Sequence, residues 1–444
     1  MSEAEEEREE PEASEPEGAE PPDEPQDRER SNTRLPVPPE LARGYLCGDL
    51  PAITGRVRET PEDFEVEELP LYEPSGEGEH LYLRIEKRGI PTLEAIRRIS
   101  TRLNVPQKRI GYAGLKDSNA LTRQTVSVQF ARVEDAARIE DEQLRLLEAR
   151  PHRNKLKVGH LRGNRFKLRL RGSGAHEAAA RAVLERLSAR GVANYFGLQR
   201  YGWERSTHLL GAALVAEDPA RLVELLLLGP AGSALDHPRV LAAREAIRAG
   251  DHAEAARRYP SRCGAERAVC RALAEGKDAP AAARLIGRKE RGLYISAFQS
   301  LLFNAYLTRR LERLDALEEG EVATLHRNGA AFVVTDAAAD APRCAAFEIS
   351  PSGPIFGRKL LRPAEGSSAR ADEDAVLAEH APGLGPELSA ALGAKPEGGR
   401  RPLRIPLTSP EVTREGEDLL LAFELPKGCY ATAVLEELFR EQVD

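Results

Sequence analysis

The stretch RPHRNKLKVGHLRGNRFKLRLR, residues 150–171, contains nine Lys or Arg and no Asp or Glu. From Phe166 onwards apolar residues alternate with basic ones, and this period of two predicts a strand with one buried and one cationic face. A helix over 176–189 is predicted to follow and to stop at Gly191. The mixture of strands and helices favours an α+β domain over a doubly wound one.

The segments before this stretch continue the mixture. Residues 53–83 alternate short apolar runs with turn-forming residues, which predicts strands joined by tight turns. Residues 92–103 have apolar side chains at helical spacing, with Thr92 as the expected N-cap. Residues 121–130 alternate as in a strand, and this pattern puts Phe130 on the buried face.

The chain changes character at about residue 206. Ala- and Leu-rich helical segments run from there to residue 314, followed by short strands and a turn-rich stretch. The last segment, 406–444, holds a strand and a helix in the style of the first part of the chain. We therefore expect one domain made of 41–205 plus 406–444, with residues 206–405 inserted into it.

The charge of the chain is unevenly distributed. The 444 residues carry a net charge of -8, but residues 1–30 hold 14 acidic residues against 3 Arg. The remainder is therefore mildly basic. The acidic, Pro-rich segment 1–40 cannot bury enough apolar surface to offset its chain entropy, so we expect a disordered tail there.

Composition and motifs argue against several classes of protein. No stretch approaches the roughly 20 apolar residues of a membrane span, and no secretory signal is evident, so a cytoplasmic protein without membrane contact is expected. Neither a metal-binding pattern nor a nucleotide-binding glycine loop occurs, so we expect no metal and no cofactor. We expect reduced, mostly buried thiols at all five cysteines: Cys47, Cys263, Cys270, Cys344 and Cys429.

The segment GYAGLKDSNALTRQ, residues 111–124, places Lys116 and Asp117 after two glycines. Glycine lets the backbone approach a ligand closely. By itself, however, a glycine-rich turn that ends in Lys-Asp is more often a simple turn than a catalytic site.

A second cluster, NYFGLQRYG at 194–202, crowds aromatic, amide and arginine side chains into nine residues. Aromatic faces stack on bases, an amide such as Asn194 can read a base edge, and Arg200 can pair with phosphate. Core packing at a turn explains the same residues equally well. The segment LPKGCYATA adds Tyr430, for which the same two explanations apply.

The basic stretch 150–171 also has two interpretations. Cations without acidic neighbours favour contact with an RNA backbone, and we assign this role to Lys155, Lys157, Arg165 and Lys167. The alternative is an ordinary solvated strand.

Together these segments resemble the tRNA pseudouridine synthases of the TruD family. The resemblance also includes TPEDFEVEELPLYEPSGEGEHLYLRIEK at 60–87, ISAFQSLLFNAYL at 295–307 and ISPSGPIFG at 349–357, all in the family's order. It implies a pseudouridine synthase-like catalytic domain on a mixed, mainly antiparallel sheet, with a large α/β insertion of the TRUD type. The implied activity is the conversion of uridine 13, in the D arm of tRNA, to pseudouridine.

The resemblance also implies roles for particular residues. Asp117 corresponds to the nucleophile of the family. The uridine pocket corresponds to Phe64, Asn194, Phe196 and Tyr430. Arg58 stands where some members have Lys, so both Arg58 and Lys116 remain candidates for the cation that supports Asp117.

The implied reaction needs no cofactor, because no atoms or electrons leave the nucleotide. It needs a carboxylate that adds covalently and later leaves, and a nearby cation keeps such a carboxylate ionised in a dry pocket. We expect a monomer whose partner is tRNA. Two alternatives remain: a non-catalytic tRNA-binding protein or RNA chaperone of the same fold, and an N-glycosidase that cleaves the base without rejoining it.

Overall fold

The computed structural model describes residues 37–231, 237–388 and 396–441. These residues belong to two compact units: Val37–Leu222 with Arg288–Asp444, and Val223–Gly287. Most of the expected acidic tail, residues 1–36, lies outside the described residues. No helix in the described part of the chain is long and apolar enough to cross a membrane.

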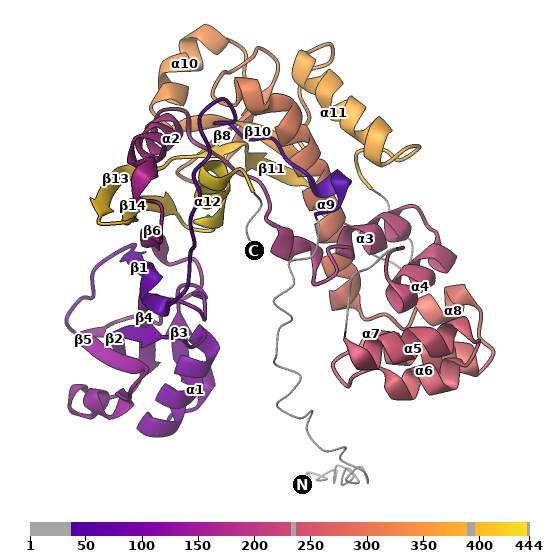
Figure 1. Ribbon diagram of the computed structural model, residues 1–444, viewed down its shortest axis with the longest axis horizontal. Helices are drawn as coiled ribbons and strands as arrows, with labels where there is room; N and C mark the ends of the chain where they lie inside the picture. Colours follow the sequence, from indigo (N-terminus) through magenta and orange to yellow (C-terminus); the bar gives the residue numbers. More distant parts are fainter. Residues whose placement is uncertain (1–36, 232–236, 389–395, 442–444) are drawn as a thin grey trace, which may run out of the picture. The chain divides into compact units, whose positions relative to one another are not determined.

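The larger unit is built on an eight-stranded sheet with the order β13-β14-β6-β1-β4-β2-β5, with β3 paired to β4 (Figure 1). Only the pair β1–β4 is parallel; the other neighbours are antiparallel. The mainly antiparallel α+β fold expected from the sequence is therefore confirmed. The strands are β1 (Phe64–Pro70), β2 (His80–Arg88), β3 (Ile110–Tyr112), β4 (Leu121–Gln129), β5 (Leu144–His152), β6 (Leu161–Leu170), β13 (Thr408–Glu415) and β14 (Asp418–Pro426).

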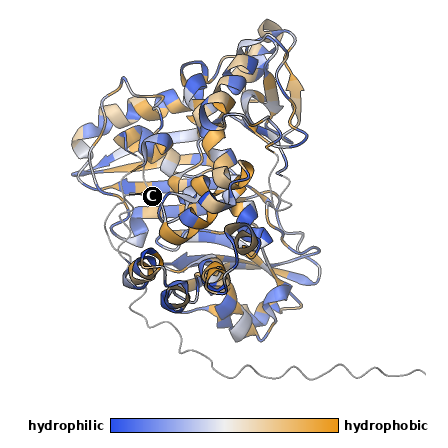
Figure 2. Ribbon diagram, turned by 90° about the vertical axis from the view of Figure 1, so that its right-hand side faces the viewer, coloured by the Kyte–Doolittle hydropathy of each residue, from blue (hydrophilic) through white to orange (hydrophobic). Residues whose placement is uncertain are grey.

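Apolar residues on one face of the sheet pack against helix α1 (Thr92–Leu103). Ile96 and Ile99 of α1 are buried with Leu83 of β2 and Val126 of β4. Hydrophilic and hydrophobic residues are interspersed along the strands (Figure 2). The opposite face of β2 is also partly covered, because Tyr82 is buried there with Ala113, Leu156 and Leu161. Helices α2 (Glu177–Arg190) and α12 (Thr432–Phe439) belong to the same unit.

Two details of the predicted secondary structure are wrong. The N-cap of α1 is Pro91, and the Thr92 hydroxyl instead donates to Gln124 Oε1 at 2.9 Å. Phe130 adopts a left-handed φ of 63° just after β4 and is 59% exposed. The strand ends before Phe130, so its alternation no longer directs that ring into the core.

A second sheet of the larger unit has the order β11-β10-β8-β9. Its strands are β8 (Val322–Leu325), β9 (Ala331–Val333), β10 (Ile349–Ile355) and β11 (Gly399–Pro402), and a separate short pair joins β7 (Val192–Ala193) to β12 (Arg404–Ile405). The long helix α9 (Arg288–Arg310) packs against β10, α3 (Thr207–Val215) and α11 (Ser368–His380). Helix α10 (Ala337–Ala345) precedes β10.

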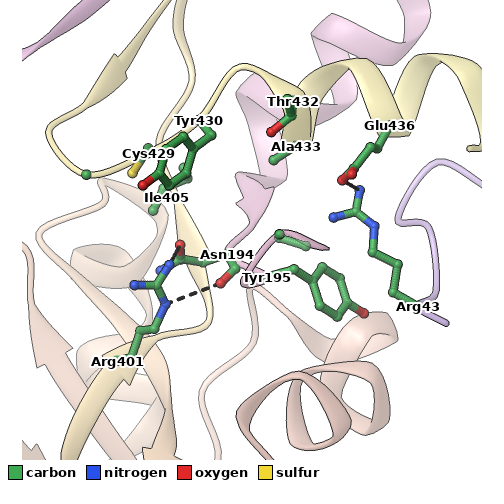
Figure 3. Close-up of a pocket in the computed structure, with 13 residues that line it drawn as sticks. Arg43, Asn194, Tyr195, Arg401, Ile405, Cys429, Tyr430, Thr432, Ala433 and Glu436 are labelled. Atoms are coloured by element: carbon green, nitrogen blue, oxygen red, sulfur yellow. Dashed lines mark hydrogen bonds and ion pairs between the residues drawn. The ribbon is translucent and has the colours of Figure 1, made fainter. Parts of the chain in front are cut away.

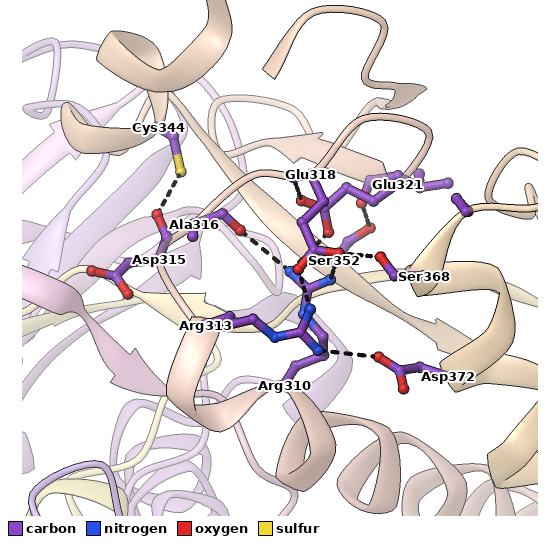
Figure 4. Close-up of polar contacts among 12 residues, drawn as sticks. Arg310, Arg313, Asp315, Ala316, Glu318, Glu321, Cys344, Ser352, Ser368 and Asp372 are labelled. Carbon is purple, nitrogen blue, oxygen red and sulfur yellow. Dashed lines mark hydrogen bonds and ion pairs between the residues drawn. The ribbon is translucent and has the colours of Figure 1, made fainter. Parts of the chain in front are cut away.

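The end of α9 is anchored by a buried cation. Arg310 is fully buried, and its Nη2 lies 3.0 Å from Glu321 Oε2 and 3.2 Å from the Ala316 carbonyl oxygen (Figure 4). Burial raises the pKa of Glu321 to about 7, although Arg310 opposes that shift.

The smaller unit is helical. It contains the end of α4 (Pro219–Leu228), followed by α5 (Pro238–Arg248), α6 (His252–Arg258), α7 (Gly264–Ala274) and α8 (Ala279–Ala283). Its core includes Val240, Ala255 and Val269. The helical character predicted after residue 206 is thus observed, while the expected domain boundaries at 205/206 and 405/406 stay a prediction.

Candidate active site

The loop that carries Asp117 connects β3 to β4 and is held at two points. The Lys116 backbone N–H donates to Thr92 Oγ1 at 2.9 Å, at the start of α1. The ammonium of Lys87, at the end of β2, donates to the Asp117 carbonyl oxygen at 2.8 Å and to the Ile90 carbonyl oxygen at 2.6 Å. Lys87 is fully buried. The backbone of Asp117 is therefore fixed from inside the protein while its side chain, 52% exposed, remains accessible.

Arg58, and not Lys116, is the cation beside the Asp117 carboxylate. Arg58 Nη2 lies 3.6 Å from Asp117 Oδ2, whereas Lys116 Nζ lies 2.7 Å from Glu68 Oε2 in a buried ion pair. Burial lowers the pKa of Arg58, and the charge of Asp117 opposes that shift. An arginine stays charged even so, which makes it a dependable partner for a carboxylate.

Phe64 forms the surface beneath the Arg58 guanidinium. The guanidinium carbon lies 4.1 Å from the centre of the Phe64 ring, a cation–π distance. Phe64 is only 1% exposed and contacts Phe166 edge to face, with ring centres 6.3 Å apart. Its ring therefore supports the cation as well as the wall of the site.

A cavity of about 480 Å³ opens at the Asp117 carboxylate. Four of the residues predicted from the sequence line it with Asp117: Arg58, Phe64, Lys116 and Tyr430. Tyr430 is 65% exposed. The volume of the cavity is in the range of pockets that hold small molecules. The walls of the cavity combine apolar rings with a carboxylate and cations, as a nucleotide requires.

Asn194 lies outside the lining of that cavity. It lines a smaller cavity of about 20 Å³, which also includes Tyr430 and Arg401 (Figure 3). The Asn194 amide is already engaged, because its Nδ2 donates to the Pro402 carbonyl oxygen at 2.8 Å and its Oδ1 accepts from Arg401.

Phe196 and Arg200 are also absent from the described lining of the larger cavity. The Phe196 ring packs edge to face on Phe303, with ring centres 5.4 Å apart. The guanidinium carbons of Arg401 and Arg200 lie 4.2 and 5.2 Å from the centre of the Phe196 ring. The Phe196 ring is therefore packed against the side chains of Phe303, Arg401 and Arg200. For the 194–202 cluster as a whole, base binding and core packing both remain as explanations.

The cationic face of β6 meets carboxylates on neighbouring strands. Arg165 Nη2 lies 2.7 Å from Glu424 Oε1 of β14, and Arg165 Nη1 lies 3.5 Å from Glu67 Oε2 of β1. Lys155 Nζ donates to the Lys108 carbonyl oxygen at 2.5 Å. Lys157 and Lys167 are exposed, and neither forms an ion pair with the residues that the structure describes. The predicted RNA-contacting cations therefore differ in how far the protein itself neutralises them.

Sequence reasoning missed several residues of the site. In the sequence, Lys87 is one of several charged residues at the end of a predicted strand, and the residues next to it do not indicate that it is buried. Asn164, Gln199 and Lys427 also line the larger cavity. Asn164 lies inside the basic stretch 150–171, and its sequence neighbours do not mark it as a residue of the site. Within the described residues, no group of three or more His, Cys, Asp or Glu could hold a metal ion.

Comparison with known proteins places this α+β chain among the pseudouridine synthases, which are isomerases. The chain belongs to the tRNA pseudouridine synthase D (TruD) family, whose family model matches residues 40–438. The resemblance recognised in the sequence segments is thereby confirmed.

Individual relatives span nearly the whole chain. A tRNA pseudouridine synthase D of Geobacter sulfurreducens is 48% identical over 399 residues, covering 89% of this chain and 96% of the relative. One of Geotalea daltonii is 45% identical over 404 residues, covering 89% and 99%. The crystal structure of a Methanosarcina mazei protein described as TruD is similar with a TM-score of 0.77 and 26% identity, covering 90% of this chain and 96% of that one.

Proposed function

We propose that this chain converts uridine 13, in the D arm of tRNA, to pseudouridine, with Asp117 as the covalent nucleophile. The observation that carries the proposal is the position of the Asp117 carboxylate, which faces a 480 Å³ cavity with its backbone anchored by Lys87 and a guanidinium 3.6 Å away. Membership of the TruD family supports both the substrate and the reaction.

The reaction needs only groups that the cavity lining offers. The carboxylate adds to the sugar or to the ring of the bound nucleotide, the bond between N1 and the sugar breaks, and the detached uracil turns. A carbon–carbon bond then forms through C5, the C5 proton is lost, N1 regains a proton, and the carboxylate leaves. Arg58 places a positive charge beside the carboxylate before the addition and after its release.

A nucleotide must leave its stack to reach Asp117. The exposed ring of Tyr430 and the apolar wall around Phe64 offer surface in exchange for the lost stacking, which costs about a few kcal/mol. The cations Lys155, Lys157 and Lys167, together with Arg200, supply contacts to phosphates along the RNA. We propose a monomeric enzyme for this task, because one chain carries the complete set of groups.

The test is an assay of purified protein on a tRNA transcript with chemical mapping of pseudouridine. We expect one modified position, uridine 13. The Asp117→Asn variant is expected to form no product while binding tRNA within a few-fold of wild type. Ser118→Ala, which alters the exposed neighbour of Asp117, is the matched control and is expected to stay active.

The same assay separates the alternatives. Release of free uracil would indicate an N-glycosidase, and tight tRNA binding by wild type without any modified nucleotide would indicate a binding protein. Full activity of Asp117→Asn would remove Asp117 from the role of nucleophile.

A further inference from the structure

Asn164 carries a buried polar atom without a partner in the wall of the cavity that contains Asp117. It lies on β6, two residues before Phe166, so both side chains are on the same face of the strand and both line the cavity. Asn164 is 9% exposed. Its Oδ1 atom is buried and accepts no hydrogen bond from the residues that the structure describes.

Neighbouring strands do not supply the missing partner. Asn164 is opposite Glu68 of β1 and Leu425 of β14. The Glu68 carboxylate has no hydrogen to donate to Oδ1, and it is itself paired with Lys116 at 2.7 Å and accepts from the Thr125 backbone N–H at 3.2 Å. Leucine has no polar side-chain atom. Since most buried polar atoms in proteins are hydrogen-bonded, an unpaired one on a residue that lines a cavity marks a place for a ligand group.

The contrast with Asn194 strengthens this reading. Both amides belong to the same unit, but Asn194 uses its Nδ2 on the Pro402 carbonyl oxygen and its Oδ1 on Arg401. A base that replaced those contacts would have to break bonds that the protein already makes. Binding to Asn164 Oδ1 breaks no hydrogen bond within the protein, because this acceptor is unpaired before the ligand arrives.

We propose that the Asn164 amide recognises the Watson–Crick edge of the extruded uracil. This inference rests on the proposed function. An amide presents an acceptor and a donor side by side, and the uracil edge presents a donor, N3–H, beside a carbonyl acceptor. Oδ1 of Asn164 accepts from N3–H while Nδ2 donates to the adjacent carbonyl oxygen. Asn164 is thus a specificity-determining residue that fixes the base in front of Asp117.

The test compares uridine with 3-methyluridine at the target position of the same RNA, because the methyl group removes N3–H. For wild type we expect kcat/KM to fall at least about a hundredfold on 3-methyluridine. For Asn164→Ala we expect kcat/KM on uridine to fall about tenfold or more, and discrimination between the two bases to shrink at least about tenfold.

Two controls separate recognition from a structural role. Asn154→Ala removes the amide of an exposed asparagine outside the cavity lining and is expected to keep the discrimination of wild type. Asn164→Leu, of similar volume, is expected to unfold at the same temperature as wild type or higher, because it removes an unpaired buried polar atom.

Each outcome of these measurements decides the inference. Undiminished discrimination in Asn164→Ala, or its loss in Asn154→Ala, would overturn the inference, and so would a lower unfolding temperature of Asn164→Leu. Wild type that is inactive on uridine RNA would instead refute the proposed function, so the two failures are distinguishable.

Discussion

Arg58 Nη2 lies 3.6 Å from Asp117 Oδ2, and this pair joins two segments that are far apart in the sequence. The two partners differ in how far their side chains are exposed. Arg58 is mostly buried, with 21% of its side chain exposed, whereas the Asp117 side chain is 52% exposed. Both residues line the cavity, but the cation is largely enclosed in its wall, whereas the carboxylate is accessible to an incoming nucleotide.

Replacing Arg58 is expected to impair the reaction more than RNA binding. Arg58→Met keeps much of the apolar contact with Phe64 but removes the charge, and we expect kcat to fall about a hundredfold or more because the carboxylate loses its fixed counter-charge. Arg58→Lys retains a charge and is expected to recover part of the loss. Equal kcat values for Arg58→Met and wild type in single-turnover assays would contradict this role.

Lys116 is expected to matter for stability and not for chemistry. Lys116→Met leaves Glu68 as a buried, unpaired carboxylate, and breaking a buried ion pair in this way costs about 3–5 kcal/mol. The double variant Lys116→Met/Glu68→Gln removes both charges and should regain most of that free energy of unfolding in a denaturant titration. Its kcat should stay within a few-fold of wild type. A hundredfold loss in the stable double variant would return Lys116 to the list of catalytic residues.

The assignments of Arg58 and Lys116 show which features of the site a sequence can predict and which it cannot. Alternation from Phe166 onwards is a local property, so the strand and the α+β class could be predicted. Whether the Lys116 side chain turns towards Asp117 or towards Glu68 depends on how β1 lies beside β4, and no local pattern encodes that parallel pairing. The sequence therefore yielded both candidate cations but could not choose between them.

The same limit explains the amides. Asn194 stood out because aromatic residues surround it in the sequence, yet Arg401, 207 residues away, occupies its Oδ1. Asn164 had no distinguishing neighbours, and it is the strand face shared with Phe166 that turns it into the cavity. Residue type and local density identify which side chains can bind a base, whereas tertiary contacts decide which of them remain available.

Lys87→Met is expected to lower activity through the backbone of Asp117. The variant removes the hydrogen bond to the Asp117 carbonyl oxygen, so the loop is held at one point fewer and the carboxylate samples more orientations. We expect kcat to fall about tenfold with little change in KM. A change in KM alone would argue that Lys87 contributes to RNA binding instead.

The stability of the Lys87→Met variant relative to wild type should depend on pH. Burial lowers the pKa of Lys87 from 10.5 to about 8, so between these values the folded protein binds fewer protons than the unfolded chain. The stability of wild type should therefore rise relative to Lys87→Met as the pH increases from 8 to 10.5, by on the order of 2 kcal/mol. Denaturant titrations of both proteins across this range measure the difference in stability, and a constant difference would contradict the lowered pKa of Lys87.

Cys429, in the lining of the larger cavity, is expected to resist alkylation. Burial raises its pKa to about 12, against the opposing charge of Arg401, so that at pH 8 only about one thiol in ten thousand is ionised. Burial raises the pKa of Cys263 to about 11, so a larger fraction of its thiol is ionised and it should react several-fold faster with iodoacetamide. Mass spectrometry of each labelled peptide over time gives both rates. Faster labelling of Cys429 than of Cys263 at pH 8 would show that its thiol is more open than the fold implies.

The exposed lysines Lys157 and Lys167 should dominate the salt dependence of RNA binding, and Arg165 should contribute little. Arg165 already has carboxylate partners on both neighbouring strands, Glu424 and Glu67, so RNA phosphates must compete with them. Lys157 and Lys167 are exposed and have no ion pair among the described residues. Each phosphate contact contributes about 0.7–0.9 to the slope of log affinity against log salt. We therefore expect Lys157→Gln/Lys167→Gln to flatten the slope by about one to two, while Arg165→Gln leaves it within experimental scatter. An equal flattening by Arg165→Gln in a binding titration from 50 to 300 mM salt would mean that RNA displaces both carboxylates, and that the intramolecular pairs seen on β6 do not persist in the complex.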